Sequence, residues 1–294
     1  MHAIKQAVAL DVGGSSVKSG LVTADGHLPF APILTAVHSA GHADEILDTF
    51  ASVIHRHIAQ IGLDQLAGVA LGFPGPFDYN TGVSRISGQA KYEALYGVDV
   101  KAGLLSRVDM GNCPLRFRND AEAAIIGECR YGAGQRDHRI IGVTLGTGLG
   151  SAFVVDHIPQ TEGSGIPPNG WLYSEIWRGM RADDLFSIRG LQARLDAVGE
   201  RDCDLKTAAE QARTGDARLQ EMFARFGIDL GDFLQPYVTA FQADAVLVLG
   251  GIAGALGVFG PAMRQVLTVP ARSGTRGTDA ALLGAADLIF STST

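Results

Sequence analysis

Two short segments of this 294-residue chain share one pattern that restricts how it can fold. Residues 7–22 read AVALDVGGSSVKSGLV, and residues 140–155 read IIGVTLGTGLGSAFVV. In each segment an apolar run leads into glycines and small hydroxyl residues, and a second run of strand-forming residues follows. The pattern predicts two hairpins. Because glycine lets the backbone approach a ligand closely, each turn is expected to bind oxygens of a polyphosphate through its N–H groups.

The first turn carries an acid, Asp11, and the second carries a hydroxyl, Thr147, and no acid. Since Mg²⁺ binds proteins through one or two carboxylates and keeps several waters, we expect a magnesium ion at Asp11, held through water. The alternative is an ordinary hairpin with an Asx-type turn. The residues expected to bind phosphate are Asp11, Gly13, Gly14, Ser15 and Lys18 in the first hairpin, and Gly146, Thr147 and Gly148 in the second.

The overall charge of −7, from 31 acidic and 24 basic residues, argues against binding to nucleic acid or to an anionic membrane. The uncharged stretch Ala245–Met263 has nearly the length of a membrane span. Its glycines and Pro261 instead favour a buried strand, a tight turn and a helix start. Three scattered cysteines without a CxxC pair indicate a reduced, cytoplasmic protein.

Strand and helix patterns alternate along the chain, which indicates an α/β fold. We expect a domain boundary at 118–120, giving domains 1–118 and 119–279, with helix 280–294 packing back on the first. Neither GxGxxG before a helix nor GxxxxGK[ST] is present. The expected helices cover 43–60, 99–106, 120–131, 201–218 and 280–290, the expected strands 68–73, 115–118 and 245–249, and a long surface loop 158–170.

Asn119 and Asp120 precede a helical segment at this boundary. Asp120 can be a helix cap, a general base, or both, and the helix N-terminus is expected to favour its ionised form. Gly250 and Gly251 follow a buried strand and allow either a tight turn or the close approach of a flat ligand such as a purine.

Five motifs occur in the order found in the ROK family of sugar kinases: DVGGSSVKSGLV, GFPGPFDYNTG, RNDAEAAIIGE, GVTLGTGLGSAFV and VLVLGGIAG. The resemblance implies two ribonuclease-H-like (actin-like ATPase) domains with a cleft between them. It also implies a cytoplasmic homodimer that uses ATP and Mg²⁺ to phosphorylate a hydroxyl of a hexose or hexose derivative. By the same resemblance, Asp120 would be the catalytic base, Asn119 a sugar ligand, and Gly250 and Gly251 neighbours of the adenosine.

Two segments depart from the common family pattern. Glu175 matches the sugar-binding glutamate of the family, but no histidine follows it and the cysteine cluster is missing, so no structural zinc is expected. The sugar loop is altered to SGQAKYEALYG, which makes Gln89 and Lys91 candidate substrate ligands. Surface solvation is the alternative for both residues.

Two other functions fit the motifs in part. Some ROK relatives are non-catalytic, sugar-sensing repressors with an N-terminal helix-turn-helix, whereas here the first hairpin begins at residue 7. A polyphosphate-dependent glucokinase is the second alternative, although the sequence offers no basic track for a long polyanion.

Overall fold

Both glycine-rich segments form antiparallel hairpins in the computed structural model, which describes residues 4–291. Strand β1 (Gln6–Val12) pairs with β2 (Ser16–Thr23), and β8 (Arg139–Leu145) pairs with β9 (Leu149–Val155). Neither turn leads into a helix, so the predicted strand–turn–strand arrangement is confirmed at both places.

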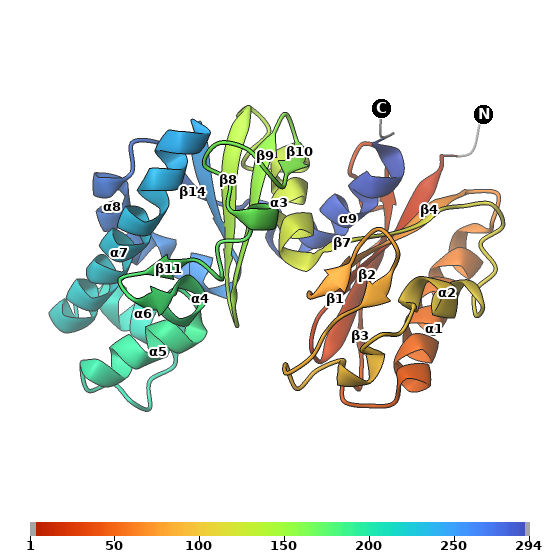
Figure 1. Cartoon of the computed structure of the whole chain (residues 1–294), viewed down its shortest axis with the longest axis horizontal. Helices are drawn as coiled ribbons and strands as arrows, with labels where there is room; N and C mark the ends of the chain where they lie inside the picture. The colour runs from red at the N-terminus through yellow and green to blue at the C-terminus, as the bar shows by residue number, and fades with distance from the viewer. Residues whose placement is uncertain (1–3, 292–294) are drawn as a thin grey trace. The chain divides into compact units, whose positions relative to one another are not determined.

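Contacts divide the chain into two units, each built on one five-stranded sheet (Figure 1). Unit 1 comprises Met1–Gly127 and Thr278–Thr294, and unit 2 comprises Glu128–Gly277. The strand order is β3-β2-β1-β4-β7 in unit 1 and β10-β9-β8-β13-β14 in unit 2. In both sheets the hairpin is followed by parallel pairing, of β1 with β4 and of β8 with β13.

The remaining elements of unit 1 are β3 (Ile33–Ala36), α1 (Ala43–Ile61), β4 (Leu66–Phe73), β5 (Phe77–Asp78), β6 (Val83–Ser84), η1 (Glu93–Leu95), α2 (Val100–Leu105), β7 (Leu115–Asn119), the start of α3 (Asp120–Tyr131), the end of η4 (Gly277–Asp279) and α9 (Ala280–Phe290). Those of unit 2 are β10 (Ile158–Gln160), η2 (Pro168–Gly170), β11 (Ile176–Trp177), β12 (Met180–Arg181), α4 (Ala182–Leu185), α5 (Ile188–Ala197), α6 (Leu205–Thr214), α7 (Ala217–Phe241), β13 (Ala245–Leu249), η3 (Gly251–Ala255), α8 (Leu256–Val266) and β14 (Ala271–Ser273).

Strand β1 is buried on both faces, which explains its nearly continuous apolar sequence. Val8 and Leu10 belong to the same buried cluster as Phe50 of α1. Alternate residues of a strand point to opposite faces, and Gly20, the partner of Ala9, lies against Leu282 of α9. Helices α1 and α9 therefore cover opposite faces of the sheet, and small residues line the face under α9.

The contact boundary lies at 127/128, whereas the sequence placed it at 118–120. Strand β7 completes the first sheet through Asn119, and the first two turns of α3 pack on α9, where a Cβ on Gly127 or Gly284 would overlap the opposing helix backbone. The end of α3, by contrast, contacts unit 2, where the carboxylate of Glu128 accepts hydrogen bonds from the N–H groups of Thr275 and Arg276. Helix α3 is therefore divided between the two units.

Two other predictions need correction. The loop expected over 158–170 contains β10, which pairs with β9, and the short helix η2. The helix expected over 201–218 is two helices, because Gly215 ends α6 in a left-handed conformation. Asp216 then caps α7 by accepting hydrogen bonds from two backbone N–H groups.

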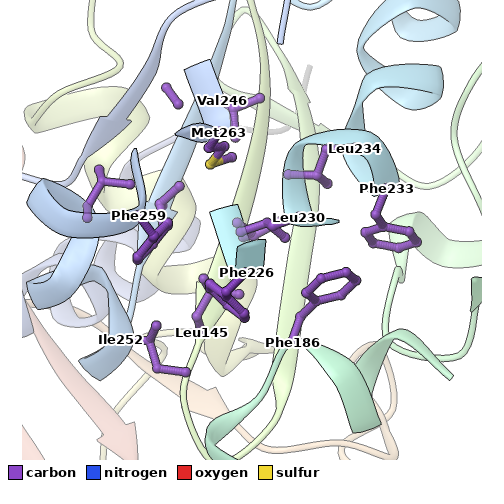
Figure 2. Close-up of a cluster of buried hydrophobic side chains, with 14 of the residues drawn as sticks. Leu145, Phe186, Phe226, Leu230, Phe233, Leu234, Val246, Ile252, Phe259 and Met263 are labelled. Carbon is purple, nitrogen blue, oxygen red and sulfur yellow. The ribbon is translucent and has the colours of Figure 1, made fainter. Parts of the chain in front are cut away.

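Unit 2 is organised around the 25-residue helix α7, which lays an aromatic stripe over the sheet (Figure 2). Phe186 stacks on Phe233 with ring centroids 5.1 Å apart, and Phe226 meets the ring of Phe259 edge-on at 5.2 Å. These ring contacts hold α4, α7 and α8 against one another.

The uncharged stretch 245–263 divides into β13, η3 and the first part of α8. Across residues 4–291, no helix combines the length and the apolar character needed to span a bilayer.

Candidate active site

The first turn, Gly13–Ser15, is exposed and has all three of its carbonyl groups bound from the protein side. Across residues 4–291, the N–H groups of Gly14 and Ser15 have no acceptor. A turn with occupied carbonyls and free N–H groups presents partial positive charge, which suits an anion. The three carbonyl contacts are Tyr92 Oη to Gly13 O at 2.5 Å, Ser39 Oγ to Gly14 O, and Val37 N to Ser15 O at 3.0 Å.

The second turn, Gly146–Gly148, is built similarly. Ile188 N–H donates to the Gly146 carbonyl at 2.8 Å, and the N–H groups of Thr147 and Gly148 lack an acceptor within the described part of the chain. The turn itself has no acid, but one from another segment lies beside it. Asp183 at the start of α4 accepts the N–H of Leu149 at 2.7 Å. Its other oxygen pairs with Arg189 at 2.7 Å, which offsets its charge near the turn.

Gly250 and Gly251 lie beside this second turn. Parallel pairing aligns Leu249 of β13 with Thr144 of β8, so Gly250 packs on Leu145. A Cβ on Gly250 would overlap the Leu145 backbone, and its φ of +84° also favours glycine. Gly251 has open space where a side chain would be, so a flat ligand has access to its backbone.

Asp11 and Asp120 are gathered at the carboxyl ends of parallel strands in unit 1. Asp11 of β1 is aligned with Gly72 of β4, and a Cβ on Gly72 would lie 3.7 Å from Cα of Asp120. Gly72 therefore lies between the two acids, and its lack of a side chain lets the start of α3 pack closely on β4. Burial, together with the charge of Asp120, raises the pKa of Asp11 to about 6, and Lys18 opposes that shift.

Asn119, rather than Asp120, is the cap of α3. Its Oδ1 accepts the N–H of Glu122 at 3.1 Å, and Asp120 is the first helical residue. The N-terminal turn of α3 favours the ionised form of Asp120 through the N–H of Ala121, and burial opposes it. Burial raises the pKa of Asp120, while the N–H of Ala121 and the charge of Lys91 lower it by less.

The altered sugar loop lies against the same edge of unit 1. Asn119 Nδ2 donates to Tyr79 Oη at 3.0 Å, and Tyr79 Oη donates to the Phe73 carbonyl. Gln89 Nε2 donates to the carbonyl of Gly75 at 2.9 Å, and a Cβ on Gly75 would lie 3.1 Å from Tyr79 Oη. Asn119 and Gln89 therefore lie in one polar region, in which each still has an amide hydrogen to donate.

Two of the residues predicted to bind a ligand, Lys18 and Glu175, have an ion pair or hydrogen bond with other residues of the protein. Lys18 Nζ lies 2.5 Å from Asp279 Oδ1 and 2.6 Å from Thr278 Oγ1, so its charge is committed within unit 1. Glu175, in unit 2, accepts a hydrogen bond from Tyr237 Oη at 2.8 Å. Burial and this carboxylate raise the pKa of Tyr237 and keep its phenol protonated.

The structure thus gathers the predicted residues into two sets. The set in unit 1 is Asp11, Gly13, Gly14, Ser15, Lys18, Gln89, Lys91, Asn119 and Asp120, and the set in unit 2 is Gly146, Thr147, Gly148, Glu175, Gly250 and Gly251. Sequence reasoning missed Tyr79 and Tyr92, which lie within two of the quoted segments, and Asp183 and Asp279, which lie outside them. Across residues 4–291, no cluster of three or more His, Cys, Asp or Glu side chains is arranged to hold a metal ion.

The fold is the two-domain, actin-like ATPase fold of the sugar kinases it matches. A proposed sugar kinase from Cytophaga hutchinsonii has a TM-score of 0.80, with 26% identity and coverage of 97% of this chain and 99% of that chain. A ROK family glucokinase from Streptomyces griseus, solved with glucose and AMPPNP, has a TM-score of 0.75, with 22% identity and coverage of 96% and 98%.

The family assignment follows from the sequence itself. The pattern of the ROK family matches residues 7–170, more than half of the chain, and this protein belongs to that family. Glucokinase from Thermotoga maritima is 27% identical over 320 aligned positions, which cover 96% of each chain. The predicted resemblance is therefore confirmed.

Proposed function

We propose that this protein transfers the terminal phosphoryl group of ATP to a hydroxyl of a hexose or hexose derivative. The observation that carries the proposal lies in unit 1, where two carboxylates and a turn with two free N–H groups share one edge of the sheet. The turn suits phosphoryl oxygens, and a carboxylate beside it can accept a proton. Similarity to glucokinase over nearly the whole chain supports the reaction class.

Asp120 is the proposed general base. The bond between the γ-phosphorus and the ADP oxygen breaks, a bond to the sugar oxygen forms, and the hydroxyl proton passes to Asp120. In phosphoryl transfer this proton leaves as the new bond forms, so a correctly placed carboxylate suffices. A pKa raised by burial makes Asp120 a better proton acceptor than an ordinary surface aspartate once it is ionised.

The other roles follow the chemistry of each position. The turn N–H groups of Gly14, Ser15, Thr147 and Gly148 bind phosphoryl oxygens. The open backbone at Gly251 accommodates the adenosine. The sugar is bound by the remaining polar side chains, namely Asn119, Gln89 and Glu175.

The donor set fits a magnesium ion. Asp11 has a pKa of about 6 because it is buried near a second carboxylate, and a divalent cation would relieve that cost. When bound there through water, Mg²⁺ would neutralise charge on the phosphate oxygens.

The direct test measures ADP release from ATP over about twenty hexoses, amino sugars and cyclitols, because pocket contacts rather than the fold decide the sugar. We expect saturable, sugar-dependent ADP release with at least one of them, which chelation of Mg²⁺ abolishes. Parallel assays replace ATP by polyphosphate. Purified, folded protein that binds ATP but releases ADP at the same rate with and without every sugar contradicts the proposal.

A further inference from the structure

Two lysines, Lys18 and Lys91, lie close to the first turn. They differ in whether the ammonium group is paired with another residue of the protein. Lys18 is held by Asp279 and Thr278. Lys91 is half-buried, and its ammonium forms no ion pair or hydrogen bond with any residue in 4–291. Lys18 would have to leave Asp279 to meet a ligand, whereas Lys91 has a positive charge available.

Lys91 lies against the first turn. Its Cδ is 3.4 Å from the point that a Cβ on Gly14 would occupy. The Lys91 side chain therefore packs against the turn at Gly14, which has no side chain. The other neighbour is Asp120, whose pKa the charge of Lys91 lowers. The Lys91 side chain therefore lies close to both the proposed phosphate-binding turn and the proposed base.

The segment around Lys91 is fixed by hydrogen bonds on both sides. Tyr92 is buried, and its N–H donates to the Ser39 carbonyl at 2.7 Å while its Oη bonds Gly13. Gln89 N–H donates to Glu93 Oε1 at 2.7 Å. Because these contacts restrain the backbone, Lys91 needs to order only its own side chain on binding, which lowers the entropic cost.

We propose that Lys91 is a further catalytic residue of this protein, which contacts the phosphoryl group in transfer rather than the sugar. The inference rests on the proposed kinase activity. A sugar is neutral and gains little from an ammonium beyond one hydrogen bond. The transferring phosphoryl group carries several negative charges, and a fixed cation stabilises them as the bond to ADP breaks.

No covalent change occurs at Lys91 in this step. Its ammonium keeps its protons, the sugar hydroxyl proton still goes to Asp120, and ADP leaves with the electron pair of the broken bond. The positive charge of Lys91 also favours the ionised form of Asp120 before the reaction. Lys91 therefore serves both the phosphoryl group and the base.

Binding of nucleotides without sugar tests this directly. Calorimetry compares the affinities of ADP and AMPPNP, with Mg²⁺ present, for the natural protein, Lys91→Gln and Lys91→Arg. The matched control is Lys101→Gln, in the same unit, whose Cβ lies near Gly82 instead of the first turn. We expect Lys91→Gln to weaken AMPPNP about tenfold while ADP changes less than about twofold. Lys91→Arg should recover part of the loss, and Lys101→Gln should change neither.

Equal losses for both nucleotides, or no loss for either, overturn the role of Lys91 and leave the kinase proposal standing. A rise in the sugar KM with unchanged kcat and unchanged AMPPNP affinity would assign Lys91 to the sugar and also overturn it. Natural protein that binds neither nucleotide contradicts the proposed function, and the inference falls with it.

Discussion

Tyr92 Oη donates a hydrogen bond of 2.5 Å to the backbone carbonyl of Gly13. This bond joins residues 79 positions apart and connects the altered sugar loop to the first turn, Gly13–Ser15. It also occupies one of the three turn carbonyls that would otherwise repel an anion. The altered loop is thus part of the construction of the turn, even though its sequence departs from the common family pattern.

Removing this hydroxyl tests that construction. Tyr92→Phe leaves the Gly13 carbonyl without its donor, and we expect a loss of about 1 kcal/mol in the free energy of unfolding. Nucleotide affinity should fall several-fold because the turn is less well ordered. The control is Tyr96→Phe, which is 62% exposed and should change neither property. Identical unfolding curves and nucleotide affinities for the two variants would show that the bond does not support the turn.

The raised pKa of Asp11 predicts how stability depends on pH. The folded state holds the Asp11 proton up to about pH 6, whereas the unfolded chain releases it near pH 4. Between these values the folded state binds more protons, so the contribution of Asp11 to stability falls as pH rises. In the absence of Mg²⁺, Asp11→Asn should therefore stabilise the protein at neutral pH, by an amount on the order of 3 kcal/mol.

Chemical denaturation at about pH 7.5 and about pH 4.5, with a chelator present, measures this gain. We expect the stabilisation by Asp11→Asn to be large at the higher pH and to shrink at the lower one. Sugar-dependent turnover should be lost, since the variant lacks the proposed magnesium ligand. A variant that is less stable than the natural protein at neutral pH would show that Asp11 is not strained by burial.

Helices α3 and α9 approach closely enough to exclude any side chain between them at Gly284. A Cβ there would overlap the carbonyl oxygen of Ala123 and lie too close to the amide nitrogen of Gly127. Both are backbone atoms, which cannot move aside as a flexible side chain can. Gly284→Ala should lower the free energy of unfolding by about 3 kcal/mol or more.

Gly257→Ala on α8 is the matched control, because no atom lies within 4 Å of the added methyl group. Replacing a helical glycine by alanine without a clash should stabilise by about 0.5–1 kcal/mol. Thermal unfolding followed by circular dichroism compares the two. Equal melting temperatures for the two variants would mean that the helices can separate at little cost.

Local patterns predicted much of the fold. The hairpins, helix α3, strand β13 and helix α9 depend on apolar periodicity and glycine placement within a few residues, and the structure has them where the sequence indicated. Errors arose where distant pairing decides the outcome. Strand β10 exists because β9 offers a partner, and the boundary at 127/128 depends on the packing of Gly127 and Gly284.

In the candidate site too, the residues with a local sequence signal were predicted, and those placed by distant contacts were not. Asp11, Asn119 and Asp120 stand out because each lies at or just after the end of a strand. Tyr92 and Asp183 had no local signal, since their partners Gly13 and Leu149 are 79 and 34 residues away. Burial also acts on the ionisation of Asp120, and its extent could not be predicted from the sequence.

Replacement of Asp120 tests whether this carboxylate accepts the proton of the sugar hydroxyl. Asp120→Asn keeps the shape of the side chain and removes its ability to accept a proton, and Asp64→Asn at an exposed position of unit 1 is the control. With a sugar found by the screen, we expect kcat to fall at least about a hundredfold while AMPPNP affinity is kept. Because burial raises the pKa of Asp120, the variant should be at least as stable as the natural protein at neutral pH. Sugar-dependent turnover close to that of the natural protein in Asp120→Asn would contradict its assignment as the base.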